Sequence, residues 1–180
     1  MLLLVDNGSI YTTNLTDFFK KQSIPFEKTT PHLCKLDGLG RYDHIVLSGR
    51  RRNDQKTNVV NTCIVRHAVD SSTKLLGICY GAEIIALALG GSIKRCHSPR
   101  TGGRTVRVIK ENSVCGGTLD VFESHRYEMA SLPDGLVPLA ESNECRYEII
   151  RHETEPVFGT QFHPEMSPDG QNLIEQFCSL

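Results

Sequence analysis

The chain has 180 residues, of which 39% are hydrophobic and 23% are charged, and its formal net charge is −1. This composition is ordinary for a globular protein, and the balanced charge argues against a nucleic acid or a membrane as the main partner. The length fits one core, so we expect a single domain over residues 1–180. The opening MLLLVDNG is too short for a signal or membrane-spanning segment and is expected to form a buried strand.

The cysteine pattern points to a reducing compartment. The seven cysteines include no Cys-x-x-Cys pair, and an odd number cannot all pair within one chain. We therefore expect free thiols and a cytoplasmic location. The seven histidines do not group with the cysteines at the short spacings of a zinc site, so no metal is expected.

The first half of the chain alternates strand-like and helix-like segments. Leu15, Phe18 and Phe19 recur at helical spacing, whereas residues 44–48 are continuously apolar, as in strands buried on both faces. Gly90 and Gly91 predict the end of an apolar helix that should be buried. The expected strands are 2–5, 25–30, 44–48 and 74–78, and the expected helices are 12–22, 58–70 and 80–89. This alternation predicts an α/β fold with a mostly parallel central sheet flanked by helices.

After Gly91 the pattern changes to short segments with apolar residues at every second position, typical of antiparallel strands. We expect them near 105–110, 118–123, 136–141 and 146–150. Residues 157–165 should form a strand that runs into a loop, and 170–180 a closing helix. The fold class is therefore α/β with an appended antiparallel β portion.

Cys79 stands between a predicted strand and a predicted helix, in the run Gly77-Ile78-Cys79-Tyr80-Gly81. A nucleophile at such a junction sits on a sharp turn, and the residues two places before and after it must be small. The first turn of a helix also favours the thiolate through its unpaired N–H groups and dipole. The alternative is a packing role, because free cysteine is among the most buried residue types.

The run QFHPE supplies partners for such a thiolate. A cysteine nucleophile needs a base, and the base needs a third group to orient it. His163 and Glu165 are two residues apart at the end of a predicted strand, so both side chains can leave on one face. The alternative for an isolated His-x-Glu is a surface pair. The carboxyl ends of parallel strands meet at one edge, which would bring both motifs into one crevice.

These residues resemble the class I glutamine amidotransferases, which have a Cys-His-Glu triad. GICYG (77–81) is similar to the family's nucleophile elbow, QFHPE (161–165) to its His-Pro-Glu motif, and VLSGR (46–50) to its oxyanion loop. The order of VDNGS, LGG, ESHRYEMASLP and ESNECRYEII further resembles the glutaminase part of the GMP synthetase subfamily. The resemblance spans nearly the whole chain and implies a flavodoxin-like core.

The resemblance implies hydrolysis of the side-chain amide of L-glutamine. Cys79 would be the nucleophile, His163 the acid and base, and Glu165 the group that orients His163. Backbone N–H groups of Tyr80 and of the loop at Gly49 and Arg50 would hold the oxyanion.

The resemblance also implies a partner. Ammonia would pass to a separate ATP-dependent synthetase subunit that converts XMP to GMP, with His125 in the segment that couples the two. No cofactor is expected in this chain, since ATP and Mg would belong to the synthetase.

Three departures from the family pattern stand out. Arg50 replaces a glycine of Gly-Gly-Pro, and a non-glycine residue at positive φ there would cost about 1–2 kcal/mol, leaving the oxyanion hole unformed until a partner binds. Glu83 replaces a substrate-binding glutamine one turn beyond Cys79, where its charge would raise the thiol pKa unless it pairs with Arg50. Tyr127 stands where the subfamily has aspartate after His125.

Several interpretations stay open at this stage. Arg50, Arg51 and Arg52 are either a solvated loop or a docking patch for an acidic partner or anionic ligand. The chain could instead be a γ-glutamyl hydrolase or an amidotransferase subunit of another pathway. A non-catalytic, partner-binding or glutamine-sensing member of the fold is a further alternative, against which the intact triad argues.

Overall fold

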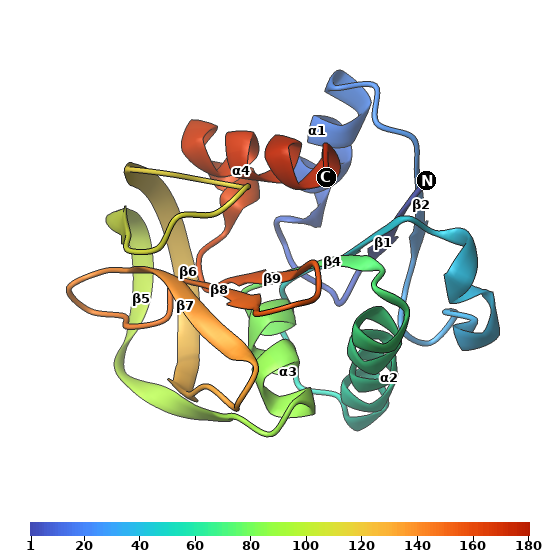
Figure 1. Cartoon of the computed structure of the whole chain (residues 1–180), viewed down its shortest axis with the longest axis horizontal. Helices are drawn as coiled ribbons and strands as arrows, with labels where there is room; N and C mark the ends of the chain where they lie inside the picture. Colours follow the sequence, from blue (N-terminus) through green and yellow to red (C-terminus); the bar gives the residue numbers. More distant parts are fainter.

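The computed structural model describes all 180 residues, and their strands form one nine-stranded sheet in the order β2-β1-β3-β4-β9-β8-β7-β5-β6 (Figure 1). The strands are β1 (Leu2–Val5), β2 (Phe26–Thr29), β3 (His44–Leu47), β4 (Lys74–Ile78), β5 (Ser92–Val108), β6 (Thr118–Ser131), β7 (Leu136–Glu141), β8 (Ile149–His152) and β9 (Val157–Thr160). The helices are α1 (Thr12–Lys21), α2 (Gln55–Ser71), α3 (Tyr80–Ala88) and α4 (Pro168–Cys178), with 3₁₀ turns at Leu36–Arg41 and Pro164–Met166.

The sheet has a parallel part and an antiparallel part. Strands β2, β1, β3, β4 and β9 pair in parallel, and β8, β7, β5 and β6 continue the sheet in antiparallel fashion. The predicted α/β fold class with an appended antiparallel portion is therefore confirmed.

The parallel part is buried on both faces, as its unbroken apolar strands predict. Along β1, Leu2 and Leu4 belong to one buried cluster and Leu3 and Val5 to the other, because successive side chains point to opposite faces. Helices α1 and α4 lie on one side of the sheet, and α2 and α3 lie on the other (Figure 1). The apolar helix α3 is buried from Tyr80 to Ala86, while Leu87 near its end is 39% exposed.

The antiparallel strands differ most from the prediction. Strand β5 begins at Ser92 rather than near 105, and β6 runs on to Ser131 rather than ending near 123. The segment 92–104 is rich in basic residues, serine and glycine and shows little apolar alternation, so it gave no strand signal. It is held as a strand by pairing with β6, with a register shift between Arg95 and Arg100.

The arrangement brings several loops to one edge of the sheet. The carboxyl ends of β1, β3, β4 and β9 are neighbours, and in a parallel sheet this edge is where ligands bind. The loop after β3 begins at Ser48, the turn after β4 holds Cys79, and the segment after β9 holds His163.

None of the helices is long and apolar enough to cross a membrane.

Candidate active site

Cys79 occupies a strained turn between β4 and α3. Its φ of +52° and ψ of −105° place a non-glycine residue in a region that side chains rarely adopt. A Cβ on Gly77 would lie 2.4 Å from the backbone of Gly81, and a Cβ on Gly81 would lie 2.5 Å from the carbonyl oxygen of Leu47. Only glycine fits both places, which agrees with the sharp turn predicted from the spacing.

His163 and Glu165 form a buried pair. Nδ1 of His163 lies 2.8 Å from Oε1 of Glu165, and both side chains are almost fully buried. They do not leave a strand on one face, as expected from alternation, because β9 ends at Thr160 and Glu165 lies on the 3₁₀ turn that follows. The backbone N–H of His163 donates to the carbonyl oxygen of Phe122 at 2.8 Å, which fixes the position of this residue. The surface-pair alternative is wrong, since both side chains are buried.

Cys79 and His163 line one cavity of about 430 Å³. Its lining also includes Arg50, Tyr80, Glu83 and His125, whereas Gly49 and Glu165 are not among the lining residues. A second cavity of similar volume lies beside β2 and is lined by none of these residues. The structure therefore brings the candidate nucleophile and the candidate base into one cavity with the residues that differ from the family pattern, Arg50, Glu83 and Tyr127.

The electrostatics of Cys79 differ from the prediction made from the helix N-terminus. Burial raises the pKa of the Cys79 thiol well above its ordinary value, and the charge of Glu83 acts in the same direction. The backbone N–H of Tyr80 and the charge of Arg50 lower it by less. The buried turn therefore keeps the Cys79 thiol protonated before substrate binds, and a thiolate has to form by proton transfer within the site.

The loop after β3 approaches the imidazole closely. A Cβ on Gly49 would lie 2.9 Å from Cε1 of His163, so a side chain at this position would displace the imidazole. Arg50, next in the chain, is not among the residues with positive φ. The anticipated backbone strain at Arg50 is therefore absent.

Arg50 is fastened by its side chain instead. Its guanidinium carbon lies 3.8 Å from the centre of the Tyr80 ring, and Nη1 donates to Oδ1 of Asn58 at 2.5 Å. Arg51 and Arg52 are exposed and also line the cavity.

Glu83 is buried beneath Cys79 without an ion pair. Nε2 of Gln161 donates to Oε1 of Glu83 at 3.3 Å, and no salt bridge joins Glu83 to Arg50, so the expected alternative of such a pair is wrong. Burial raises the pKa of Glu83, while Gln161 and the charges of Arg50 and His125 lower it by less. Glu83 lines the cavity and is the only carboxylate to do so.

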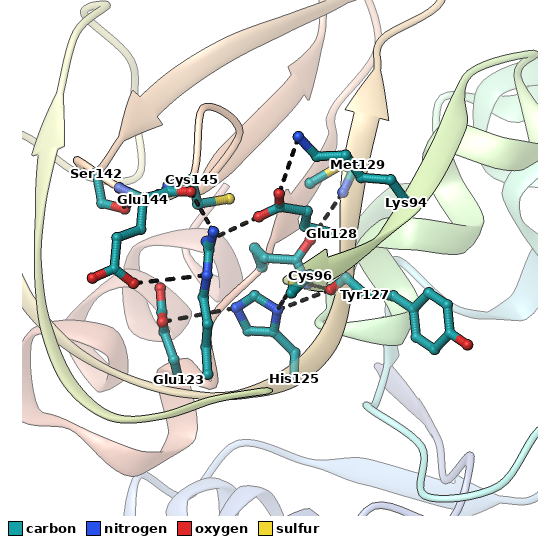
Figure 2. A network of polar contacts seen from close by, with 12 residues as sticks. Lys94, Cys96, Glu123, His125, Tyr127, Glu128, Met129, Ser142, Glu144 and Cys145 are labelled. Carbon is teal, nitrogen blue, oxygen red and sulfur yellow. Dashed lines mark hydrogen bonds and ion pairs between the residues drawn. The ribbon is translucent and has the colours of Figure 1, made fainter. Parts of the chain in front are cut away.

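His125 belongs to a polar network inside the antiparallel part of the sheet (Figure 2). Its Nδ1 donates to the carbonyl oxygen of Tyr127 at 2.8 Å, and Nε2 lies 3.8 Å from Oε2 of Glu123. Only 1% of the His125 side chain is exposed. In the same network, Oε2 of Glu128 forms an ion pair with Nη1 of Arg100 at 2.9 Å. His125 is thus a buried residue of β6 that also lines the cavity, not an exposed loop histidine.

Two site residues were not predicted from the sequence. The ring of Tyr11 packs edge-on against His163 with centroids 4.6 Å apart, and nothing in the sequence signals this contact. Gln161 orients Glu83, and its place two residues before His163 on the same segment was an available signal. The structure brings together no group of three or more His, Cys, Asp or Glu side chains able to hold a metal ion.

Fold and site geometry together define a known class of protein. Residues 3–179 match the family model for glutamine amidotransferase class-I, so the chain belongs to that family, as its motifs predicted. Among its relatives is the glutamine-hydrolysing GMP synthase subunit of Methanocaldococcus jannaschii, 29% identical over 188 residues that span 100% of this chain and 97% of that protein. The subunit of the same name from Thermoplasma acidophilum is 30% identical and covers 99% of this chain and 92% of its own length.

Solved structures agree with this assignment. A crystal structure from Thermoplasma acidophilum matches with a TM-score of 0.88 at 27% identity and covers 99% of this chain and 92% of that chain. A glutamine amidotransferase from Thermotoga maritima matches with a TM-score of 0.76 at 21% identity, which shows the shared fold alone.

Proposed function

We propose that this chain hydrolyses the side-chain amide of glutamine as the glutaminase subunit of a two-subunit GMP synthetase. Cys79 is the nucleophile, His163 the acid and base, and Glu165 the group that orients His163. The proposal treats residues 1–180 as one amidotransferase domain that acts in the cytoplasm. The observation that carries it is the strained turn at Cys79 opening into the same cavity as the His163–Glu165 pair.

The first half of the reaction follows from these roles. The Sγ–H proton of Cys79 moves to Nε2 of His163 as Sγ attacks the amide carbon, which suits a thiol whose pKa is raised by burial. The carbonyl oxygen becomes an oxyanion held by backbone N–H groups of Tyr80 and of the loop at Gly49 and Arg50. His163 then gives the proton to the leaving nitrogen, and ammonia departs.

The second half releases glutamate. His163 takes a proton from water, the resulting hydroxide attacks the glutamyl thioester, and the C–S bond breaks. The proton returns from His163 to Sγ of Cys79. Glu165 accepts the Nδ1–H of His163 throughout and stabilises the imidazolium.

The acceptor of the ammonia is inferred from the relatives. Two relatives that match this chain over nearly its whole length are named as glutamine-hydrolysing subunits of GMP synthase. We infer that a separate ATP-dependent subunit converts XMP to GMP and that ATP and Mg belong to it. Because the His125 side chain is buried, coupling would run through the exposed neighbours Arg126 and Tyr127 rather than through direct contact with the imidazole.

The test measures glutamate released from glutamine, with and without the synthetase subunit from the same source. Wild type should release glutamate, either by itself or once that subunit is added, and Cys79→Ala should release none. The matched control is Cys63→Ala, which removes an exposed thiol on α2 and should leave turnover unchanged. Activity that survives in Cys79→Ala would refute the mechanism.

The acceptor is tested in the same reaction. Formation of GMP from XMP, ATP and glutamine should require wild-type chain and fail with Cys79→Ala, while added ammonium salts restore it. Glutamate release without any GMP formation would favour an amidotransferase of another pathway or a γ-glutamyl hydrolase. No release under any condition would favour a non-catalytic member of the family.

A further inference from the structure

Arg50 departs from the family pattern, yet its side chain is among the most firmly held at the cavity. The guanidinium carbon lies 3.8 Å from the centre of the Tyr80 ring. Its Nη1 donates to Oδ1 of Asn58 at 2.5 Å, and the Tyr80 hydroxyl donates to the same oxygen at 2.9 Å. Nδ2 of Asn58 donates to Asn53 at 3.2 Å, which fixes the orientation of the amide. Arg50 and Tyr80 are therefore joined twice, by stacking and by a shared acceptor.

The same loop is tethered at its other end. The backbone N–H of Asn7 donates to Oγ of Ser48 at 2.9 Å, and Nδ2 of Asn7 donates to the Ser48 carbonyl oxygen at 2.8 Å. Nδ2 of the fully buried Asn61 donates to Oδ1 of Asn7 at 2.7 Å and lies 3.4 Å from the Tyr80 hydroxyl. The contacts run from Ser48 through Asn7 and Asn61 to Tyr80, where they meet those from Arg50.

These contacts join the two backbone segments that would form the oxyanion hole under the proposed function. One half of the oxyanion hole would come from the loop at Gly49 and Arg50, and the other from Tyr80, directly after Cys79. Oxyanion donors act only if they are held where the charge develops. A side-chain link between Arg50 and Tyr80 sets the separation of the two halves without backbone strain, because Arg50 does not have positive φ.

We propose that Arg50, Asn58 and Tyr80 form a clamp that positions the two halves of the oxyanion hole relative to each other. The inference rests on the proposed function for its catalytic consequence. Arginine suits this place because its planar guanidinium can stack on the ring while donating at its edge, which a lysine ammonium cannot do. Arg50 is therefore a positioning residue in this chain.

The kinetic test uses Arg50→Met, which keeps the side-chain length without the guanidinium, and Asn58→Ala. A positioning role acts in the transition state, so kcat for glutamate release should fall about tenfold to a hundredfold while KM stays within about twofold. The double variant should lose no more than the worse single variant, since both remove one unit. Asn58→Asp keeps the acceptor oxygen and should retain kcat. The control is Arg66→Gln, an exposed arginine on α2 outside the clamp.

A second readout does not depend on turnover. Amide hydrogen exchange in the segment 48–53 should quicken in Arg50→Met and Asn58→Ala and stay unchanged in Arg66→Gln. Unchanged exchange overturns the clamp, whatever the activity, and so does a kcat of Arg50→Met within twofold of wild type. A raised KM at constant kcat would also overturn it, since Arg50 would then bind the substrate. Cys79→Ala decides the proposed function separately, so the two failures can be told apart.

Discussion

The pair of carboxylates beside His125 should make the stability of the protein depend on pH. Glu123 and Glu148 are both fully buried and contact each other. Burial and the charge of Glu123 raise the pKa of Glu148 to about 8. Although burial opposes it, the neighbouring His125 and Glu148 side chains lower the pKa of Glu123. The pair therefore holds one proton near neutral pH and titrates as a unit.

The direction of the effect follows from proton counts. Unfolded Glu148 loses its proton near pH 4.3, whereas the folded chain keeps it to about pH 8. Between these values the folded state binds more protons, so the free energy of unfolding falls as pH rises, by at most about 1.4 kcal/mol per pH unit. From pH 5 to pH 8 the ceiling is roughly 4 kcal/mol. The lowered pKa of Glu123 adds stability that is lost only in acid, so it is constant across this window.

Glu148→Gln keeps a hydrogen-bonding amide and removes the titration. We expect its unfolding free energy to fall less between pH 5.5 and pH 8 than that of wild type. Urea unfolding followed by circular dichroism at pH 5.5, 6.5, 7.5 and 8 measures this difference. The control Glu175→Gln alters an exposed carboxylate on α4 and should keep the wild-type slope. Parallel slopes for wild type and Glu148→Gln would refute the assignment of the proton to this pair.

The remaining predictions concern the elbow. Gly77→Ala places a Cβ 2.4 Å from the backbone of Gly81, so the free energy of unfolding should fall by about 2 kcal/mol and glutaminase activity should be lost. The control is Gly116→Ala, whose added Cβ would meet no atom within 4 Å. Wild-type stability in Gly77→Ala would contradict the clash. Glu83→Gln keeps an acceptor for Gln161 and removes a charge that raises the pKa of Cys79. The pH profile for alkylation of Cys79 by iodoacetamide, followed by peptide mass spectrometry, should shift to lower pH, with higher turnover of glutamine; an unchanged profile would exclude this role of the carboxylate.

Local spacing along the chain was enough to predict the parallel half of the fold and the central motifs of the site. Unbroken apolar runs mark strands buried on both faces, and glycines on both sides of Cys79 mark a turn that tolerates no side chain there. The order of strands and helices then implies that Cys79 and the QFHPE segment meet at the carboxyl edge of the sheet. These features depend on periodicity and adjacency, which are properties of short stretches of sequence.

Only the tertiary structure decided how the unusual residues are used. Whether Arg50 strains the backbone or stacks on Tyr80, and whether Glu83 pairs with Arg50 or with Gln161, depends on side chains brought together from distant segments. The length of β5 could not be predicted from the sequence either, because its polar first half forms a strand by pairing with β6 and has no apolar alternation of its own. The sequence by itself determined which groups are available for the chemistry. Long-range packing determined their separations and their burial, and hence the protonation of the Cys79 thiol.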